Sequence, residues 1–418
     1  MCQAPDRSPP RPSGRAATWG RRRLPPRLAF AVVAFLLGAT LLGNTGLSAL
    51  YVVYQRQLGF PAWMLTAVYA TYAASVLATL VVAGRVSDRV GRRRAILPAV
   101  GILVAGTVTF ILADAVVWLV VGRVLQGVGT GILLGAATAA LVELDPDGDE
   151  ARAALATTLA FVAGAALGPL VFGALAQFTP WPTVAPFLLE ASLLVGGLTA
   201  ALGLPETVAE AGAATTPPRR VPVPAVPAEL RGAFLLAATA IGLAWSVNAL
   251  YAALGPSLAS RVFHEHSRLL GGGTLFVYFL AGGTGQVGLR RLVTRHAVML
   301  GGTLLGVGIV LVSLALAVHR PGPFVVGTVA AGLGSGVCFL GGLTLINQTA
   351  PPDRRAELVS AYNMVGYLAL ALPVLGVGAL TGIIGLLTTT LVFAGVVVSA
   401  AGLAVAGAAR YRHQHPTR

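Results

Sequence analysis

Arg123 and Gln126 are polar residues inside a long apolar run, where their side chains could bind a ligand or a charge. Arg123 lies about eight residues inside the run 115–144, with Gln126 one turn later. A charged side chain at membrane depth costs at least about 2.5–3.5 kcal/mol on insertion scales, so it needs a cavity or a partner. We therefore expect Arg123 to contact a substrate or to tune a nearby proton carrier. The alternative is that its long side chain reaches the outer interface of the membrane.

Glu190 is an acidic residue that lies clearly within an apolar run, 183–204. Proton coupling needs a carboxyl group that can gain and lose a proton at membrane depth. Glu190, with Arg123 as the charge that tunes it, is therefore the candidate for proton coupling. A structural pair is an equally open interpretation of this acid. The acidic run 145–150 is instead interpreted as a solvated turn.

Other patterns in the chain give no enzyme chemistry. Residues 127–131 have the glycine spacing of a dinucleotide loop but lie inside an apolar run with no preceding strand. Residues 264–266, His-Glu-His, are interpreted as a solvated external loop. Cys2 and Cys338 are too few and too far apart for a disulfide framework or a metal site. With no phosphate-binding loop and no nucleophile–base arrangement, we expect no enzyme activity, no metal and no cofactor.

The composition is that of a polytopic membrane protein. Of the 418 residues, 56% are hydrophobic and only 11% are charged, against about 25% charged in soluble domains. The net charge is +14 and every basic residue is Arg. Nucleic acid is excluded as a partner because the arginines sit at the ends of apolar runs and form no basic face.

The elements that must position the polar residues are membrane-spanning helices, each needing about 20 apolar residues. Twelve runs are long enough, six on each side of a Pro- and Arg-containing stretch, which predicts an all-α protein of two bundles. The predicted parts are a disordered basic tail at 1–27, a first bundle at 28–204, a flexible linker at 205–231, a second bundle at 232–408 and a tail at 409–418.

Arginine placement predicts the orientation of these helices. With the N-terminus in the cytoplasm, 24 arginines fall in cytoplasmic segments and 4 in segments on the other side. Positive residues favour the cytoplasmic side of a membrane. The sequence therefore predicts a multi-pass protein of the cell inner membrane with both termini in the cytoplasm.

The most charged loop, 84–94, carries five arginines and one aspartate. Its pattern, Gly84-x-Val-Ser-Asp88-Arg89-x-Gly91-Arg92-Arg93, resembles the loop motif between the second and third helices of the major facilitator superfamily. The glycine pattern of 127–131 also recurs at 332–336, and duplicated halves are the usual plan of secondary transporters. The resemblance covers residues 28–408 and implies two pseudo-symmetric six-helix bundles.

The resemblance also implies a gating latch in this charged loop. Asp88 and Arg92 would hold the cytoplasmic faces of the two halves together in the outward-open state. In the second half Leu289 stands where the acid would be, so the latch is expected in the first half alone. The alternative is that the arginines only fix topology. The expected latch residues are Gly84, Asp88, Arg89, Gly91, Arg92 and, as a partner on the fourth helix, Glu143.

Two further motifs resemble those of the same superfamily. The pattern from Arg123 to Gln126 is similar to its fourth-helix motif. The pattern of the fifth run is similar to the Gly–Pro motif of its exporter, or antiporter, branches, although close helix packing is the alternative explanation. Asn44 stands where some proton-coupled relatives have an acid, which leaves the coupling mechanism open. The residues of the fifth-run motif are Gly164, Gly168, Pro169 and Gly173.

In this fold the first, fourth, seventh and tenth helices line the central cavity, so their polar and aromatic residues are the binding candidates. The set is mostly neutral with aromatic faces, which suits a moderately apolar or amphipathic ligand. Any one of these residues could instead make a helix–helix hydrogen bond. The candidates are Asn44, Tyr51, Arg123, Gln126, Trp245, Asn248, Tyr251 and Asn347.

The sequence thus predicts a secondary transporter of the drug/proton antiporter type. It would export a small drug-like or amphipathic molecule by alternating access, with the proton gradient as its energy source. Its expected partners are that small molecule and the lipid bilayer, and we expect a monomer. The alternatives are an importer of a nutrient or metabolite and a membrane sensor that transports nothing.

Overall fold

All regular structure in the described part of the chain is helical. The computed structural model describes residues 23–83, 87, 90–207, 226–265, 267–351 and 354–414. Three predicted latch residues, Gly84, Asp88 and Arg89, lie outside the described residues, as do residues 208–225 of the predicted linker. In chain order the helices are α1 (Pro26–Leu58), α2 (Ala62–Ala83), α4 (Arg92–Ile111), α5 (Val116–Leu144), α6 (Glu150–Phe178), α7 (Ala185–Ala201), the short 3₁₀ turn η2 (Ala228–Leu230), α8 (Arg231–Phe263), α9 (Arg268–Gly288), α10 (Thr294–Val318), α11 (Pro321–Thr349) and α12 (Arg355–Gln414).

Local sequence features explain where several of these helices begin and end. Asp149 caps α6, because its side chain accepts hydrogen bonds from the backbone N–H groups of Ala151 and Arg152. Ser267 caps α9 in the same way. Gly59 ends α1 with φ at 66°, a left-handed conformation that glycine adopts without a steric penalty from a Cβ.

In the described residues the long helices number twelve, as predicted, when the two arms of α12 are counted separately. Nine helical segments in the described ranges are long and apolar enough to span a membrane, and α7 is a shorter apolar helix. α9 has 21 residues and is not among these nine segments. α12 is one 60-residue element, but Gly385, with φ 78° and ψ 165°, breaks it into two arms. The arms correspond to the last two predicted spans.

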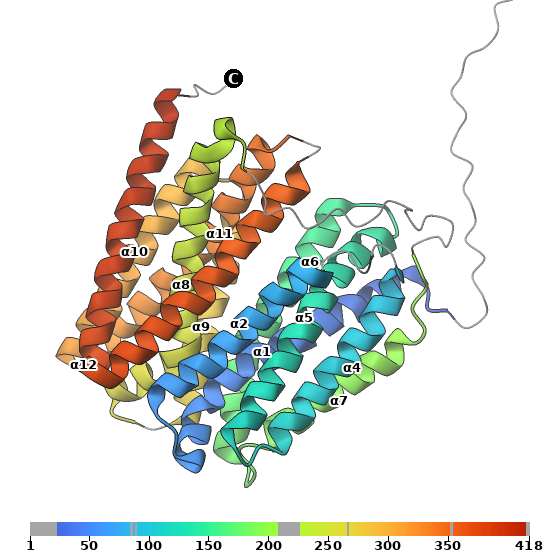
Figure 1. Ribbon diagram of the computed structural model, residues 1–418, viewed down its shortest axis with the longest axis horizontal. Helices are drawn as coiled ribbons and strands as arrows, with labels where there is room; N and C mark the ends of the chain where they lie inside the picture. Colours follow the sequence, from blue (N-terminus) through green and yellow to red (C-terminus); the bar gives the residue numbers. More distant parts are fainter. Residues whose placement is uncertain are drawn as a thin grey trace, which may run out of the picture.

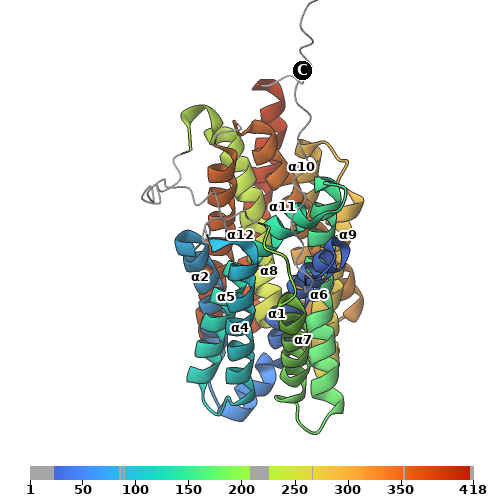
Figure 2. The ribbon, with the colours of Figure 1, turned by 90° about the vertical axis from the view of Figure 1, so that its right-hand side faces the viewer.

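The crossings form two six-helix bundles, one from α1, α2 and α4–α7 and the other from α8–α12 (Figure 1). We call the side on which α1 begins and α12 ends the termini side, and the opposite side the distal side. In Figure 1 the two bundles converge toward the distal side, at the bottom, and diverge toward the termini side. Figure 2 shows the same bundles from the side, with their helices running in one general direction.

The two halves meet where α6 packs against α9 and where α2 packs against α12. Near the distal side, the backbone N–H of Arg268 donates to Gln177 Oε1 over 3.1 Å, and Arg268 Nη1 donates to the carbonyl of Ala176. Gly272 lets the backbones approach, because a Cβ there would overlap the carbonyl of Pro169. The distal side is therefore the closed side of the molecule.

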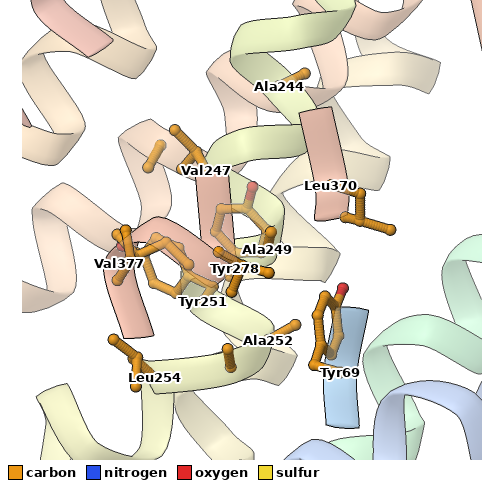
Figure 3. Close-up of a cluster of buried hydrophobic side chains, with 14 of the residues drawn as sticks. Tyr69, Ala244, Val247, Ala249, Tyr251, Ala252, Leu254, Tyr278, Leu370 and Val377 are labelled. Carbon is orange, nitrogen blue, oxygen red and sulfur yellow. The ribbon is translucent and has the colours of Figure 1, made fainter. Parts of the chain in front are cut away.

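Buried side chains form two clusters, one within the first half and a larger one that runs from the second half into the first. Figure 3 shows part of the larger cluster. The rings of Tyr251 and Tyr278 stack with centroids 4.2 Å apart, and Tyr69 of α2 lies near them from the other half. An aromatic side chain of the first half, Tyr69, thus belongs to the same buried cluster as the tyrosine pair of the second half.

Candidate functional site

Arg123 of α5 is fully buried in the first half, and its guanidinium is the centre of a polar network. Its Nε and Nη2 both donate to the hydroxyl of Tyr51, over 3.0 and 2.5 Å. Its Nη1 donates to the backbone carbonyl of Asn44 over 3.0 Å and to Gln126 Oε1 over 2.9 Å. Four of the predicted cavity residues are therefore in one network joining α1 and α5.

The aromatic rings around Arg123 supply much of its stabilisation. Its guanidinium carbon lies 5.4 Å from the ring centroid of Tyr51, 5.9 Å from that of Tyr69 and 5.4 Å from that of Tyr72. Contacts within about 6 Å are attractive and strengthen when water is excluded. Among the described residues Arg123 makes no ion pair with an acid, so neutral hydroxyl, amide and ring groups hold its charge.

Asn44 extends the network from α1 to α2 and α5. Its amide Nδ2 donates to Thr130 Oγ1 over 2.9 Å and to the hydroxyl of Tyr72 over 3.2 Å. The position where some relatives have an acid is therefore occupied by an amide whose N–H groups are satisfied. Its Oδ1, in contrast, has no hydrogen-bond partner in the part of the chain that the structure describes.

Glu190 of α7 is 1% exposed and lies against α1. Its carboxyl group lies where a Cβ of residue 43 would be, so Gly43 is what lets this side chain reach α1. Thr107 of α4 and Gln126 of α5 face the carboxyl group, and Arg123 is close enough to interact with it electrostatically. The embedded acid and the embedded arginine thus lie on either side of Gln126.

This region concentrates polar atoms that lack a partner. Within the described first half, five buried side-chain atoms around α1, α5 and α7 make no hydrogen bond: Thr40 Oγ1, Asn44 Oδ1, Ser48 Oγ, Gln126 Nε2 and Glu190 Oε2. Native proteins satisfy the large majority of buried polar groups, so such exceptions need an explanation. Most of the unpaired buried side-chain atoms of the described first half lie around α1, α5 and α7.

The candidates of the second half are not brought into one network. Trp245 packs against Phe339 and Tyr367, with centroids 6.4 and 4.7 Å away. Asn248 is half-buried, and its Oδ1 has no hydrogen-bond partner among the described residues. The other two candidates lie apart: the hydroxyl of Tyr251 binds Thr328 within its own bundle, and Asn347 is exposed near the end of α11.

Three residues of the network did not appear among the sequence candidates. Tyr69 and Tyr72 of α2 both place their rings on Arg123, and Thr130 binds Asn44. The signal was available for the tyrosines, since residues three apart share one face of a helix. Thr130 carries no such signal within its glycine-rich stretch.

The end of the charged loop that the structure describes is held inside the first half. Arg92 donates to Glu143 through Nε and Nη2, with a shortest distance of 2.9 Å, and through Nη1 to Ser87 Oγ over 2.9 Å. Gly91, with φ at 104°, brings the start of α4 onto the carboxyl group of Glu206, which accepts the backbone N–H of Arg92 over 2.7 Å. Glu143 therefore pairs with Arg92 within the first half, and the predicted latch between the two halves stays a prediction, with Asp88 outside the described residues.

The residues of the Gly–Pro motif of α6 face two neighbours. Gly164 and Gly168 lie against the backbone of α1, where a Cβ would overlap the carbonyls of Gly38 and Leu42. Further along, Pro169 and Gly173 contact α9 of the other half. The motif therefore joins the helix of Asn44 to the contact between the halves.

The acidic turn after α5 contains an ion pair in addition to solvated acids. Arg152 donates to Asp145 through Nε over 2.7 Å and Nη2 over 2.6 Å, and to Asp147 over 2.7 Å. The Arg152 side chain, together with the backbone N–H groups of Asp149 and Asp147, holds the pKa of Asp145 below its usual value. This pair fixes the start of α6.

Known proteins resemble this chain along its length. It matches the family profile described as Major Facilitator Superfamily over two overlapping stretches, residues 4–116 and 33–373. It is 34% identical over 135 residues to YhjO of Bacillus subtilis, an MFS-type transporter, covering 32% of this chain and 33% of YhjO. It is 27% identical over 165 residues to MdtD of Klebsiella pneumoniae, named as a multidrug resistance protein, covering 40% of this chain and 34% of MdtD. The matched stretches span about a third of these two relatives.

Solved structures share the fold. A POT-family peptide transporter in complex with alafosfalin has a TM-score of 0.77 at 18% identity, covering 94% of this chain and 96% of that one. The nucleoside transporter NupG has a TM-score of 0.73 at 14% identity, covering 91% and 99%. At these identities the likeness shows the fold alone. With two six-helix bundles and a profile match that runs through both, the chain belongs to the major facilitator superfamily.

Proposed function

We propose that this transporter exports a small amphipathic, drug-like molecule in exchange for protons, by alternating access. The termini side would face the cytoplasm of a bacterial cell and the distal side the outside. The arginine count of the loops supports this orientation, since 24 arginines fall in segments assigned to the cytoplasm and 4 in segments on the other side.

The observation that carries the proposal is the pair of embedded charged residues in one network. Among the described residues, Arg123 donates hydrogen bonds to neutral groups only, and one carboxyl oxygen of Glu190 has no hydrogen-bond partner. Gln126 lies between them, accepting from Arg123 through Oε1 and facing Glu190. A proton arriving on or leaving Glu190 would change the charge that Arg123 experiences, and so the bonding around Tyr51 and Asn44 on α1.

This coupling would reach the contact between the halves through α1 and α6. Gly164 and Gly168 hold α6 against α1, and the next turns of α6 contact α9. A rearrangement of α1 around Asn44 could therefore be transmitted to the distal contact. Asp88 and Arg92 would close the termini side in the opposite state, with Glu143 binding Arg92 when the latch is open.

The substrate class follows from the side chains near the contact between the halves. Tyr69, Tyr251, Tyr278 and Trp245 offer aromatic faces, with few charged groups beside them. The three tyrosines are buried in this state, and if alternating access exposes these side chains they would suit an apolar body with a few hydrogen-bonding groups. The name of the relative MdtD, a multidrug resistance protein, supports the same class.

Inverted membrane vesicles with an imposed pH gradient, acid inside, test the proposal. A broad panel of lipophilic cations and neutral amphiphiles is added, and ligand uptake into the vesicles is followed together with proton release. We expect uptake of at least one ligand to drive proton release from the lumen. Failure of the whole panel would reject antiport, and movement of ligand with the protons would identify an importer.

In this assay Glu190→Gln removes the carboxyl group that is proposed to carry the proton. Asp114→Asn is the control, because Asp114 is an exposed acid between α4 and α5. Glu190→Gln is expected to abolish proton release while ligand binding persists. Asp114→Asn should behave as the unaltered protein. Normal proton release by Glu190→Gln would assign the proton to another group.

A further inference from the structure

A groove of the second half is lined by residues of α8 and of the two arms of α12. Its volume is about 380 Å³, within the range of small-molecule sites. Val392 and Val396 on its rim are 47% and 63% exposed. An exposed apolar rim on a membrane-spanning segment faces hydrocarbon, so the groove is open to the bilayer.

This groove is separate from the contact between the halves. Thr239, Gly242 and Ser246 line it from α8, whereas Asn248 and Trp245 are the predicted cavity residues of that helix. An α-helix turns about 100° per residue, so Thr239 and Asn248, nine positions apart, point about 180° from each other. The groove therefore lies on the opposite face of α8 from the predicted substrate path.

The lining is apolar apart from three hydroxyl groups, and none of the described residues that form it is charged. Thr239 donates to the carbonyl of Leu235, and Ser246 donates to that of Ala369. Thr389 is 1% exposed, and its Oγ1 makes no hydrogen bond with any described residue. One buried polar atom is thus left without a partner at the edge of an apolar groove.

The break at Gly385 explains why Thr389 is unpaired. Threonines in these helices normally donate to the carbonyl four residues earlier, as Thr390 does to Leu386 over 2.7 Å. For Thr389 that carbonyl belongs to Gly385, whose φ of 78° and ψ of 165° leave the helical conformation. A buried hydroxyl without a partner is unfavourable, and a ligand with a hydrogen-bonding group would remove that cost.

We propose that this groove binds a neutral single-chain amphiphile from the bilayer, with its hydrocarbon chain along α8 and α12 and one hydroxyl or carbonyl group on Thr389. The absence of charge in the described lining excludes an ionic headgroup as the preferred ligand. Binding here requires neither export nor proton coupling, so the inference stands independently of the proposed function.

Two glycines allow the groove to be filled without disturbing the protein. A Cβ at Gly242 or at Gly376 would meet no atom within 4 Å, and both residues line the groove. Leucine at either position would occupy the groove itself. Gly402 of the same α12 arm as Thr389 is equally open but does not line the groove, which makes Gly402→Leu the matched control.

The test uses purified protein in lipid nanodiscs and a long-chain primary alcohol that carries a photoreactive diazirine on its chain, with the corresponding alkane as the second probe. Labelled peptides are identified by mass spectrometry over a range of probe concentrations. We expect saturable labelling within 239–246 and 373–400, reduced about tenfold or more by Gly242→Leu and Gly376→Leu and unchanged by Gly402→Leu. Thermal unfolding of each variant confirms that it is folded.

Thr389→Val separates the headgroup contact from simple filling of an apolar space. It should weaken labelling by the alcohol about three- to tenfold, the size of one net hydrogen bond, and leave labelling by the alkane unchanged. Equal loss for both probes, no loss for either, or labelling spread over all lipid-facing helices would overturn the proposal. A cross-link from the groove to a second copy of the chain would also overturn it, by showing a helix–helix contact there.

Discussion

Substitution of Gly43 by alanine tests whether the position of Glu190 against α1 matters. All three of the nearest atoms that a Cβ at residue 43 would meet belong to the carboxyl group of Glu190. The added methyl group must therefore displace that carboxyl group, and the side chain is 1% exposed, with little room to move. Overpacking of this kind costs about 1–3 kcal/mol, so we expect Gly43→Ala to lower the stability of the protein by that amount.

Thermal unfolding of purified protein measures this loss, and two further variants make it specific. Gly38→Ala on the same helix is the control, because its Cβ would make only an ordinary 3.4 Å contact with the carbonyl of Ala160. The double variant Gly43→Ala/Glu190→Ala removes the overlap. The loss of unfolding free energy in the double variant should be smaller than the summed losses of the two single variants by about 1 kcal/mol or more. Coupling energies of this size are measured for residues in contact.

Gly43→Ala also tests whether Glu190 couples ligand movement to proton movement. If Glu190 carries the proton, its displacement from Gln126 should reduce ligand-driven proton release in vesicles, and Gly38→Ala should not. The reasoning is refuted if Gly43→Ala and Gly38→Ala melt together and transport equally well. Loss of stability with normal proton release would retain the packing argument and remove Glu190 as the carrier.

Three other changes have expected outcomes. Arg123→Lys should fold but lose about tenfold or more in transport rate in the vesicle assay, because one ammonium group cannot reproduce the forked hydrogen bonds of a guanidinium. Asp145→Asn should lower the melting temperature at neutral pH. Because contact with Arg152 lowers the folded-state pKa of Asp145, its stabilisation exists above the unfolded-state pKa and is lost as pH falls through the folded-state pKa, so the difference should shrink in strong acid. Gly272→Ala should loosen the distal contact, since its Cβ would overlap the carbonyl of Pro169, and lower cross-linking between cysteines placed on α6 and α9.

The helices were predictable from the sequence because hydrocarbon allows few other backbone arrangements. Long apolar runs and arginine-rich loops therefore predict twelve crossings directly. The break in α12 was harder to place, because Gly385 lies in a stretch of apolar residues with no charged or Pro-rich turn. The predicted spans ended at 380 and resumed at 383, whereas the conformational break occurs at residue 385.

The site was predictable in part, and the limit has a physical cause. An arginine at membrane depth must be satisfied, so Arg123 could be named from its position alone. The free-energy cost of burying the guanidinium does not determine which groups contact it. Hydroxyl, amide and carbonyl groups and aromatic ring faces can all do so, and many residues carry them. The structure selects Tyr51, Tyr69 and Tyr72, two of which are on α2, a helix outside the set expected to line the path. Partners of this kind depend on how helices rotate against each other, which small residues such as Gly43 decide by permitting close approach. A buried charge in a membrane protein can therefore be located from sequence, but its partners are set by packing.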